Sequence, residues 1–418
     1  MIEAILERFP PAPRVAQAAR RAFARCDPAA RAGVDAAVHA NVLHAFTSEG
    51  IADSDLAGAY GYGYDDAARA RYESLLTRIF GAERALARLS FVSGTHAIVT
   101  ALDACLPHAG RLVCAAGRPY DTLRNALVDA PHSLVRRGVH YEETALLPDG
   151  AIDFTGLTDA CARGVDVVFV QRSRGYASRR SLSSQECGAI ADVVRAVAPH
   201  AFVLVDNCYG ELVEASEPTH HGVDAVMGSL IKNLGGGLAP GGGYVIGRAT
   251  VIERVAARHY APGLGDGVGP TLGFGRTFVQ GLFQAPLVVA QCLAGLEFVA
   301  ALFEELGERV DPAPGDARRD IVQAIALGSP ARVAAFACGL QRAMPLNARF
   351  VPEAGSVPGY RESVIMSGGA FVAGATIELS CDAPLRPPYE VYVQGGTSRA
   401  HVLLGALFAA DSLYAESN

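Results

Sequence analysis

The chain has 418 residues, of which 50% are hydrophobic and 19% are charged, and this composition excludes a disordered or collagen-like protein. At roughly 150 residues per domain, the length indicates two or three domains. The net charge of −7 argues against nucleic acid or an anionic membrane as a partner.

The first predicted element is an Ala- and Arg-rich segment over residues 1–48, which we expect to be helical and to serve as an arm or a subunit contact. It lacks a basic region followed by an apolar run, so no signal peptide is expected. No stretch reaches the roughly 18 to 20 uninterrupted apolar residues of a membrane span. The nine cysteines include no C-x-x-C pair, so we expect a cytoplasmic protein with reduced cysteines, without disulfides or a metal site.

A second group of predicted elements follows a helical pattern over residues 72–80. Short apolar runs that read as strands alternate there with helical stretches, at 111–115, 165–170, 202–205 and 244–246. Strands that alternate with helices predict an α/β fold with a mostly parallel sheet covered on both faces.

The C-terminal part predicts a smaller α/β domain. It contains a helical pattern over 296–309, a Pro-rich stretch over 311–314 and a strand-like run over 371–379. We therefore divide the chain into a helical arm, a large domain and a small domain, at residues 1–50, 51–295 and 296–418.

Polar residues follow several of the predicted strands, and in open α/β sheets ligands bind beyond the carboxyl ends of strands. Ser93, Gly94 and Thr95 precede a helical run, which places small side chains and free backbone amides where an anion could bind. An ordinary helix N-cap is the alternative interpretation. Asp206 ends the apolar run 202–205, where a buried carboxylate could accept a proton from a ligand nitrogen or could cap the next element.

Lysine is almost absent from this chain: 36 residues are Lys or Arg, and only Lys232 is a lysine. Because a lysine amine can lose its proton and form a Schiff base, whereas arginine cannot, Lys232 is a candidate catalytic residue. It lies between Ser229 and two glycine triplets, 235–237 and 241–243. Codon bias that spared one lysine by chance is the alternative interpretation.

A lysine for a Schiff base, a strand-end aspartate for a pyridinium nitrogen and a Ser/Gly-lined phosphate cup together describe a pyridoxal phosphate site. Their order resembles the fold-type I enzymes of cysteine and methionine metabolism, and most closely the methionine gamma-lyase-related group known as aluminium-resistance proteins. The segments that carry this resemblance are Gly61–Asp66, Ser93–Ala97, Pro119–Leu123, Gln171–Tyr176, Asp206–Glu211, Gly228–Asn233, Gln280–Phe283, Ile377–Ser380 and Gln394–Gly396.

The resemblance implies a pyridoxal-phosphate-dependent transferase-like fold and a role for each matching residue. Lys232 would hold the cofactor as an internal aldimine and move the Cα proton, which leads to a Cα carbanion. Asp206 would keep the pyridine nitrogen protonated. Tyr120 would stack on the ring and could donate a proton to the leaving group. The phosphate would bind at the helix start that contains Ser93, with contacts from Gly94, Thr95 and Ser229.

The resemblance also implies a homodimer or homotetramer with shared active sites, because Tyr62 or Tyr64 would reach the phosphate of the neighbouring subunit. For the substrate carboxylate we choose Arg386. The arginine that classical gamma-lyases carry before a Leu-Ser pair is Glu378 here, so that assignment cannot be transferred. Which of Gln171 to Arg174 flanks the cofactor stays open.

We therefore expect a lyase that eliminates a β- or γ-substituent from an amino acid, in the manner of carbon–sulfur lyases such as methionine or cystathionine gamma-lyase. One alternative with the same cofactor is γ-replacement, or elimination of a non-sulfur group such as halide to give an unsaturated amino acid. A second alternative is a non-catalytic protein whose glycine loops bind a phosphate ligand. No G-x-x-x-x-G-K-[ST] or G-x-G-x-x-G segment follows a predicted strand, which weakens this second alternative.

Overall fold

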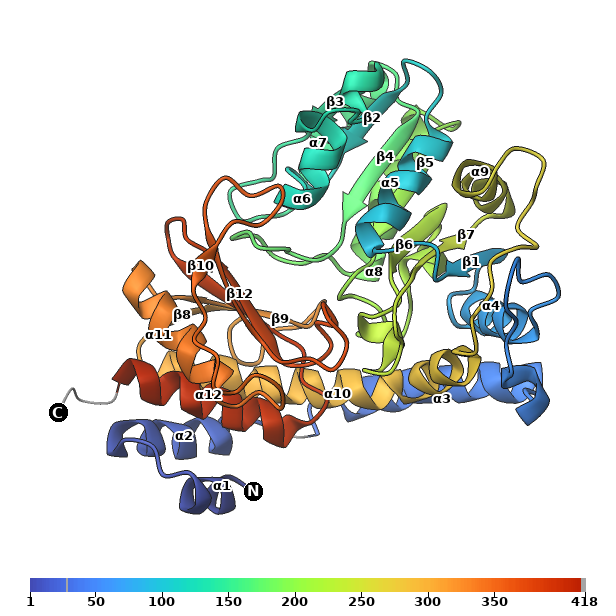
Figure 1. The fold of residues 1–418 in the computed structure, drawn as a ribbon. Helices are drawn as coiled ribbons and strands as arrows, with labels where there is room; N and C mark the ends of the chain where they lie inside the picture. The colour runs from blue at the N-terminus through green and yellow to red at the C-terminus, as the bar shows by residue number, and fades with distance from the viewer. Residues whose placement is uncertain (28, 415–418) are drawn as a thin grey trace. The chain divides into compact units, whose positions relative to one another are not determined.

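The computed structural model describes residues 1–27 and 29–414 (Figure 1). The chain divides into two compact units. One consists of residues 36–286, and the other joins residues 1–35 to residues 287–418. Each unit has its own sheet, and the predicted lysine, aspartate and serine all lie in the unit formed by residues 36–286.

A seven-stranded sheet forms the centre of the unit 36–286. Its order is β1 (Arg84–Arg88), β7 (Gly243–Gly247), β6 (Ala225–Ser229), β5 (Phe202–Asp206), β4 (Val167–Gln171), β2 (Arg111–Cys114) and β3 (His140–Glu143). All neighbours are parallel except that β7 runs antiparallel to both β1 and β6. The mostly parallel sheet predicted from the alternation of strands and helices is confirmed, and each of the four predicted runs overlaps one of these strands.

Both faces of this sheet are buried. Leu204 and Phe169 belong to a core cluster that includes residues of α5 (Gly94–Cys105) and α9 (Ala249–His259), two helices in contact with each other (Figure 1). The alternate residues Val203 and Val205 have no exposed surface either, so the opposite face is covered as well. The other helices of this unit are α4 (Ala67–Ile79), α6 (Asp121–Arg124), α7 (Phe154–Ala162) and α8 (Ser184–Val197).

Two long helices contain the boundaries between the units, α3 (Ala32–Glu49) and α10 (Gly275–Glu305). Helix α10 has 31 residues and is long and apolar enough to cross a membrane, but 72% of its most apolar 18-residue stretch is buried inside the structure. Such burial is typical of a core helix in a globular protein. The helix predicted over 296–309 corresponds to the last part of α10, which ends at Glu305, and strand β8 (Arg309–Asp311) follows.

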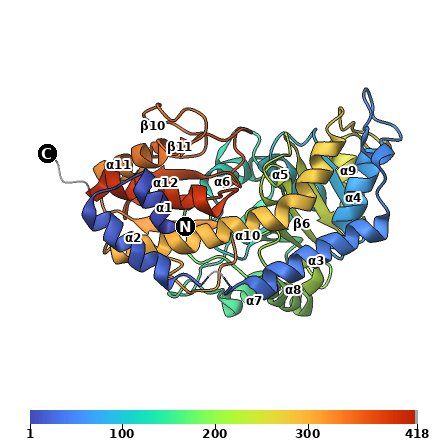
Figure 2. The ribbon, with the colours of Figure 1, turned by 90° about the horizontal axis from the view of Figure 1, so that it is seen from below.

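The other unit contains a six-stranded antiparallel sheet. Its order is β10 (Ala354–Gly355), β11 (Val364–Gly368), β12 (Ser380–Pro384), β13 (Glu390–Gln394), β9 (Val322–Ala326) and β8 (Arg309–Asp311). Helices α11 (Pro330–Gln341) and α12 (Arg399–Tyr414) pack together, and α2 (Pro13–Arg25) lies against α12 (Figure 2). Helix α1 (Ile2–Arg8) completes this unit, so the helical character predicted for residues 1–48 is confirmed as α1, α2 and α3.

The strand predicted over 371–379 is wrong, because this segment forms turns and β12 begins only at Ser380. Gly374 has φ +81°, and the amide of Ala375 donates to the Val372 carbonyl at 2.9 Å. The Glu378 carboxylate also accepts hydrogen bonds from the amides of Phe371 (3.0 Å) and Val372 (3.2 Å). These bonds hold the apolar residues in a turn instead of a strand, and they give Glu378 a local structural role.

Candidate active site

The carboxyl ends of three parallel strands bring polar residues together at one edge of the seven-stranded sheet. Asp206 ends β5, Gln171 ends β4 and Ser229 ends β6. Gln171 and Asp206 are register partners in neighbouring strands. Asp206 and Ser229 are almost completely buried, with 4% of each exposed.

The predicted anion cradle begins α5. The Ser93 hydroxyl accepts a hydrogen bond from the amide of His96 at 3.1 Å, so Ser93 is the N-cap of this helix. Gly94 lies directly against Ser229 and Cys208, because a Cβ atom on Gly94 would stand 3.1 Å from the Ser229 Cβ and 3.4 Å from the Cys208 Sγ. The start of α5 is thus packed against the end of β6, and the glycine permits this close approach without displacing Ser229.

Substitution of Gly94 by alanine is expected to weaken the binding of pyridoxal phosphate about tenfold, because the added methyl group would push the helix start away from Ser229. Titration of the purified variant with pyridoxal phosphate measures this effect. Gly33→Ala is a matched control, since nothing lies within 4 Å of its Cβ position in α3. Equal affinities of the two variants would contradict the assignment of Gly94.

Asp206 is a buried carboxylate without a charged partner in close contact. Its Oδ1 accepts a hydrogen bond from the Cys208 amide at 3.1 Å, and no ion pair to it occurs in the part of the chain that the structure describes. Burial raises the pKa of Asp206 to about 6, although the Cys208 hydrogen bonds and the charges of Arg179 and Lys232 act in the opposite direction. A protonated ring nitrogen would give this carboxylate the cationic partner that its burial favours.

Lys232 lies in the loop that follows β6, at the same edge of the sheet. The Lys232 amide donates to the Ser229 carbonyl at 3.3 Å, and the Lys232 carbonyl accepts from Gly235 at 3.0 Å, which makes a tight turn. The Lys232 Nζ stands 4.9 Å from the centre of the Tyr209 ring. Tyr209 was not among the predicted site residues, although its place three residues after Asp206 puts it at the same strand end.

Tyr120 is held by two hydrogen bonds at this edge. Its amide donates to the Gln171 Oε1 at 2.9 Å, and its hydroxyl shares a hydrogen bond with the Thr95 Oγ1 at 2.8 Å. Burial, with the nearby charge of Asp206, holds the pKa of Tyr120 well above its usual value, so the hydroxyl keeps its proton and can donate it.

The sequence did not decide which of residues 171–174 flanks the cofactor. In the structure, Gln171 and Arg172 make hydrogen bonds that support other residues of the site. Gln171 positions the backbone of Tyr120. Arg172 is completely buried and donates to the Asn207 Oδ1 at 2.6 Å and to the Glu214 Oε2 at 2.6 Å. Arg172 therefore supports the segment around Asp206 from within the protein.

Of the predicted site residues, two make no contact with the residues above in the part of the unit 36–286 that the structure describes, and a third belongs to the other unit. Tyr62 and Tyr64 are 76% and 62% exposed, and their ring centres are 5.8 Å apart. Arg386 belongs to the other unit, where its guanidinium stands 3.8 Å from the Glu362 carboxylate. The position of Arg386 relative to Lys232 stays a prediction.

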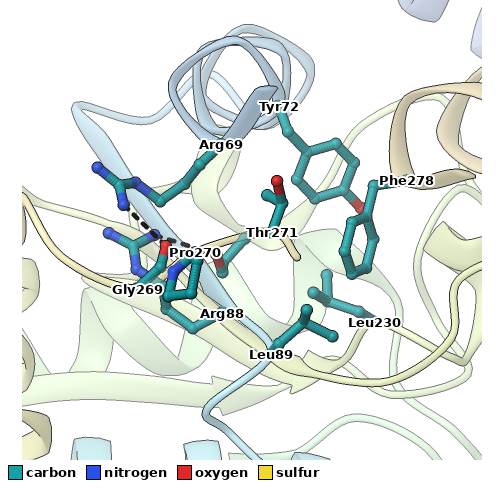
Figure 3. A pocket seen from close by; sticks show the side chains of 10 residues that line it. Arg69, Tyr72, Arg88, Leu89, Leu230, Gly269, Pro270, Thr271 and Phe278 are labelled. Carbon is teal, nitrogen blue, oxygen red and sulfur yellow. Dashed lines mark hydrogen bonds between the residues drawn. The ribbon is translucent and has the colours of Figure 1, made fainter. Parts of the chain in front are cut away.

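The loop that carries Tyr62 and Tyr64 is anchored by Arg69. The Arg69 guanidinium donates to the carbonyls of Gly63 and Gly269, both at 2.7 Å. Figure 3 shows Arg69 beside a small cavity, lined also by Tyr72, Arg88, Thr271 and Phe278. The cavity measures about 10 Å³, which is room for one water molecule but not for a cofactor. The exposed tyrosines are thus presented by a firmly held loop.

A family model described as methionine gamma-lyase matches residues 16–414. A solved structure from Clostridium acetobutylicum, described as a candidate cystathionine beta-lyase involved in aluminum resistance, is 36% identical, with a TM-score of 0.94 over 99% of this chain and 98% of that chain. A second, described as a carbon-sulfur lyase involved in aluminum resistance from Clostridium novyi NT, is 33% identical, with a TM-score of 0.92 over 98% of both chains.

The fold is also shared with the pyridoxal-5'-phosphate dependent protein YhfS from Escherichia coli. That structure has a TM-score of 0.61 at 17% identity, over 90% of this chain and 95% of that chain. The predicted fold class, that of the fold-type I enzymes that use pyridoxal phosphate, is confirmed. The resemblance to proteins of the aluminium-resistance group is confirmed as well.

Proposed function

Because the chain belongs to the methionine gamma-lyase family, we propose that it is a pyridoxal-phosphate-dependent lyase that eliminates a β- or γ-substituent from an amino acid. The family and the two solved relatives support a lyase of the carbon–sulfur or cystathionine type. The observation that carries the proposed use of pyridoxal phosphate is the placement of the only lysine, beside Tyr209 and within the electrostatic reach of the buried Asp206.

The residues at this sheet edge fit the cofactor. Gly94 packs closely against Ser229 at the start of α5, where helix-start amides could bind a phosphate group, and the buried Asp206 carboxylate is suited to a protonated ring nitrogen. Ser93, Thr95 and Ser229 would complete the phosphate site, with Tyr120 against the ring. When bound, pyridoxal phosphate supplies an electron sink that makes the Cα proton of an amino acid acidic.

Lys232 and Tyr120 would share the proton transfers. The Lys232 amine would take the Cα proton of the substrate, because it is the only side-chain amine of this protein. The Tyr120 hydroxyl, which keeps its proton, would donate to the leaving group. Arg386 is our proposed partner for the substrate carboxylate, since a guanidinium can bind both of its oxygens. We expect these reactions to occur in the cytoplasm.

The proposed function is tested by supplying amino acids with thiol, thioether, hydroxyl and halide leaving groups. Keto acid and ammonia, formed together with the free leaving group, are expected for at least one sulfur-containing substrate. Unsaturated or substituted amino acids as the main products would instead favour the elimination of a non-sulfur group or γ-replacement. A purified protein that cannot be loaded with pyridoxal phosphate would overturn the proposal.

Replacement of Tyr120 by phenylalanine is expected to lower the rate of elimination about 10²-fold, because the aromatic ring remains while the proton donor is lost. Affinity for pyridoxal phosphate should change little. Steady-state kinetics and cofactor titration measure the two effects separately. Tyr141→Phe, which removes a hydroxyl that donates to Glu143 at 2.7 Å in strand β3, is the control. An elimination rate in Tyr120→Phe equal to that of the control would exclude Tyr120 as the acid.

We further propose that the active sites are shared within a homodimer or homotetramer. The support is the large exposure of Tyr62 and Tyr64 on a loop that Arg69 holds firmly. Such aromatic side chains are favourable contacts for a second copy of the chain. Their hydroxyl groups are available to a phosphate group held by the partner.

Removal of the hydroxyl that reaches the partner's phosphate is expected to lower the affinity for pyridoxal phosphate about tenfold. Tyr62→Phe and Tyr64→Phe are matched variants, and the affected one identifies the contact. Light scattering gives the number of subunits. A monomeric protein with full activity would refute the shared site.

A further inference from the structure

Three buried polar side chains lie in or beside the lysine loop, the segment 230–242 that follows β6 and contains Lys232. Asn233 directly follows Lys232, Glu211 lies in the segment after Asp206, and Tyr244 belongs to β7. Asn233, Glu211 and Tyr244 have no exposed surface. Because they are buried in the protein itself, we do not expect them to touch the substrate, and the proposed reaction gives them no chemical step.

Asn233 joins the two segments that carry the lysine and the aspartate. Its Nδ2 donates to the carbonyl of Tyr209 at 3.1 Å and to the carbonyl of Glu211 at 2.8 Å. Tyr209 has the left-handed backbone conformation, with φ +71°, and its ring lies beside the Lys232 amine. The Asn233 amide group therefore fixes the left-handed turn at Tyr209, whose ring lies beside Lys232, and also fixes the backbone at Glu211.

Glu211 ties this assembly to the sheet. Its Oε1 accepts a hydrogen bond from the Tyr244 hydroxyl at 2.7 Å. Its Oε2 and the Asn233 Oδ1 are both buried without a hydrogen-bond partner among the described residues. Burial, together with the charges of Glu217 and Asp206, raises the pKa of Glu211 to about 8, although the Tyr244 hydrogen bond acts in the opposite direction. A neutral Glu211 carboxyl group supplies an O–H donor to this cluster, in which the Asn233 Oδ1 has no donor among the described residues.

We propose that Asn233 and Glu211 are positioning residues, which fix the loop after β6 to the segment after Asp206 and so determine where the Lys232 amine stands. The inference rests on the proposed function, which gives the Lys232 amine its chemical role. The contacts themselves are independent of any cofactor, which permits a test on the protein alone.

The test uses the fact that Lys232 is the only lysine. Reductive methylation with formaldehyde and cyanoborohydride modifies its amine, and mass spectrometry of the peptide gives the rate. In Asn233→Ala we expect methylation about fivefold faster, because the loop is released, and affinity for pyridoxal phosphate about tenfold lower. Glu211→Gln should keep both values within about twofold, since the amide is neutral and retains an acceptor and donors, whereas Glu211→Leu should behave like Asn233→Ala.

A matched control separates positioning from general stability. Gln341 also binds two carbonyls through its amide, those of Asn347 (3.0 Å) and Gly368 (2.9 Å), but in the other unit. Gln341→Ala should lower the melting temperature and leave the methylation of Lys232 unchanged. If Asn233→Ala does no more than this, the positioning role is overturned.

Two further outcomes complete the test. If Asn233→Ala does not fold, the contrast between Glu211→Leu and Glu211→Gln decides, and equal methylation rates in these two variants overturn the role. A protein that shows the expected methylation rates but never binds pyridoxal phosphate would support the positioning role and refute the proposed function.

Discussion

Lys232→Ala is expected to lower the rate of elimination by about 10⁴-fold or more, the largest effect of any single substitution in this chain. The change removes the group that would hold the cofactor and also the base that would take the Cα proton. No other side-chain amine can take over, because the remaining Lys or Arg residues are all arginines. Steady-state kinetics and the visible spectrum after addition of pyridoxal phosphate measure the loss.

The control is Lys232→Arg, which keeps the positive charge beside Tyr209 but cannot form a Schiff base. Treatment of the loaded wild-type protein with borohydride should bleach its yellow colour and attach the cofactor to one peptide, which contains Lys232. Attachment at the chain terminus instead, or full activity in Lys232→Arg, would refute the role of this lysine.

Asp206→Asn is expected to have the second largest effect, a loss of activity of about 10³-fold, because an amide cannot stabilise a protonated ring nitrogen. The same substitution should stabilise the protein without cofactor. Asp206 is buried and its pKa is raised from 3.8 to about 6, so its ionised form opposes folding. At neutral pH the difference corresponds to about 3 kcal/mol as an upper bound.

The pH dependence of stability follows from the raised pKa of Asp206. In the folded protein this carboxyl group retains its proton up to about pH 6, whereas in the unfolded chain it loses the proton near 3.8. Its contribution to stability is therefore fully present below about pH 4 and is lost as the pH rises through 6. Asp206→Asn should lack this change in denaturant titrations between pH 4 and 7.

Asp166→Asn is the matched control for Asp206→Asn. The Asp166 carboxylate accepts a hydrogen bond from the Arg111 amide at 2.8 Å, just before strand β4 begins. The substitution Asp166→Asn should change neither the activity nor the pH dependence of stability. A variant Asp206→Asn with both high activity and unchanged stability would contradict the role of the buried carboxylate.

Four of the seven strands of the large sheet could be predicted from the sequence, because apolar runs such as 165–170 and 202–205 are buried on both faces and leave a continuous signal, whereas β1, β3 and β6 were not predicted. The place of Asp206 at the ligand-binding edge then follows from the rule that parallel strands end at one edge, whereas β6, which ends at Ser229 and precedes Lys232, carried no predicted strand. The direction of β7 could not be predicted, since an apolar run has the same appearance in either direction.

Other features depend on contacts that a local pattern does not contain. The segment 371–379, which was wrongly predicted as a strand, has apolar residues, but the Glu378 carboxylate, Gly374 and backbone bonds such as that from Ala375 to Val372 hold it in turns. The N-terminal helices join the C-terminal segment through contacts such as that of the Ala12 amide with Asp411, at 2.7 Å. Tyr209 was missed because its contact with Lys232 joins two segments that are distant in the sequence, and its left-handed backbone carries no local signal.

Strand β7 runs back along β6, so the segment 230–242 is the loop of a β-hairpin, closed by the bond from the Leu230 amide to the Gly242 carbonyl at 3.0 Å. Closing such a short loop costs little chain entropy, whereas Ser93 and Asp206 reach the same edge only through pairings between distant segments. The pairing of β6 with β7 is therefore local, whereas the lysine loop also depends on the bonds from Asn233 to Tyr209 and Glu211, and Ser93 and Asp206 depend on the pairing of distant strands.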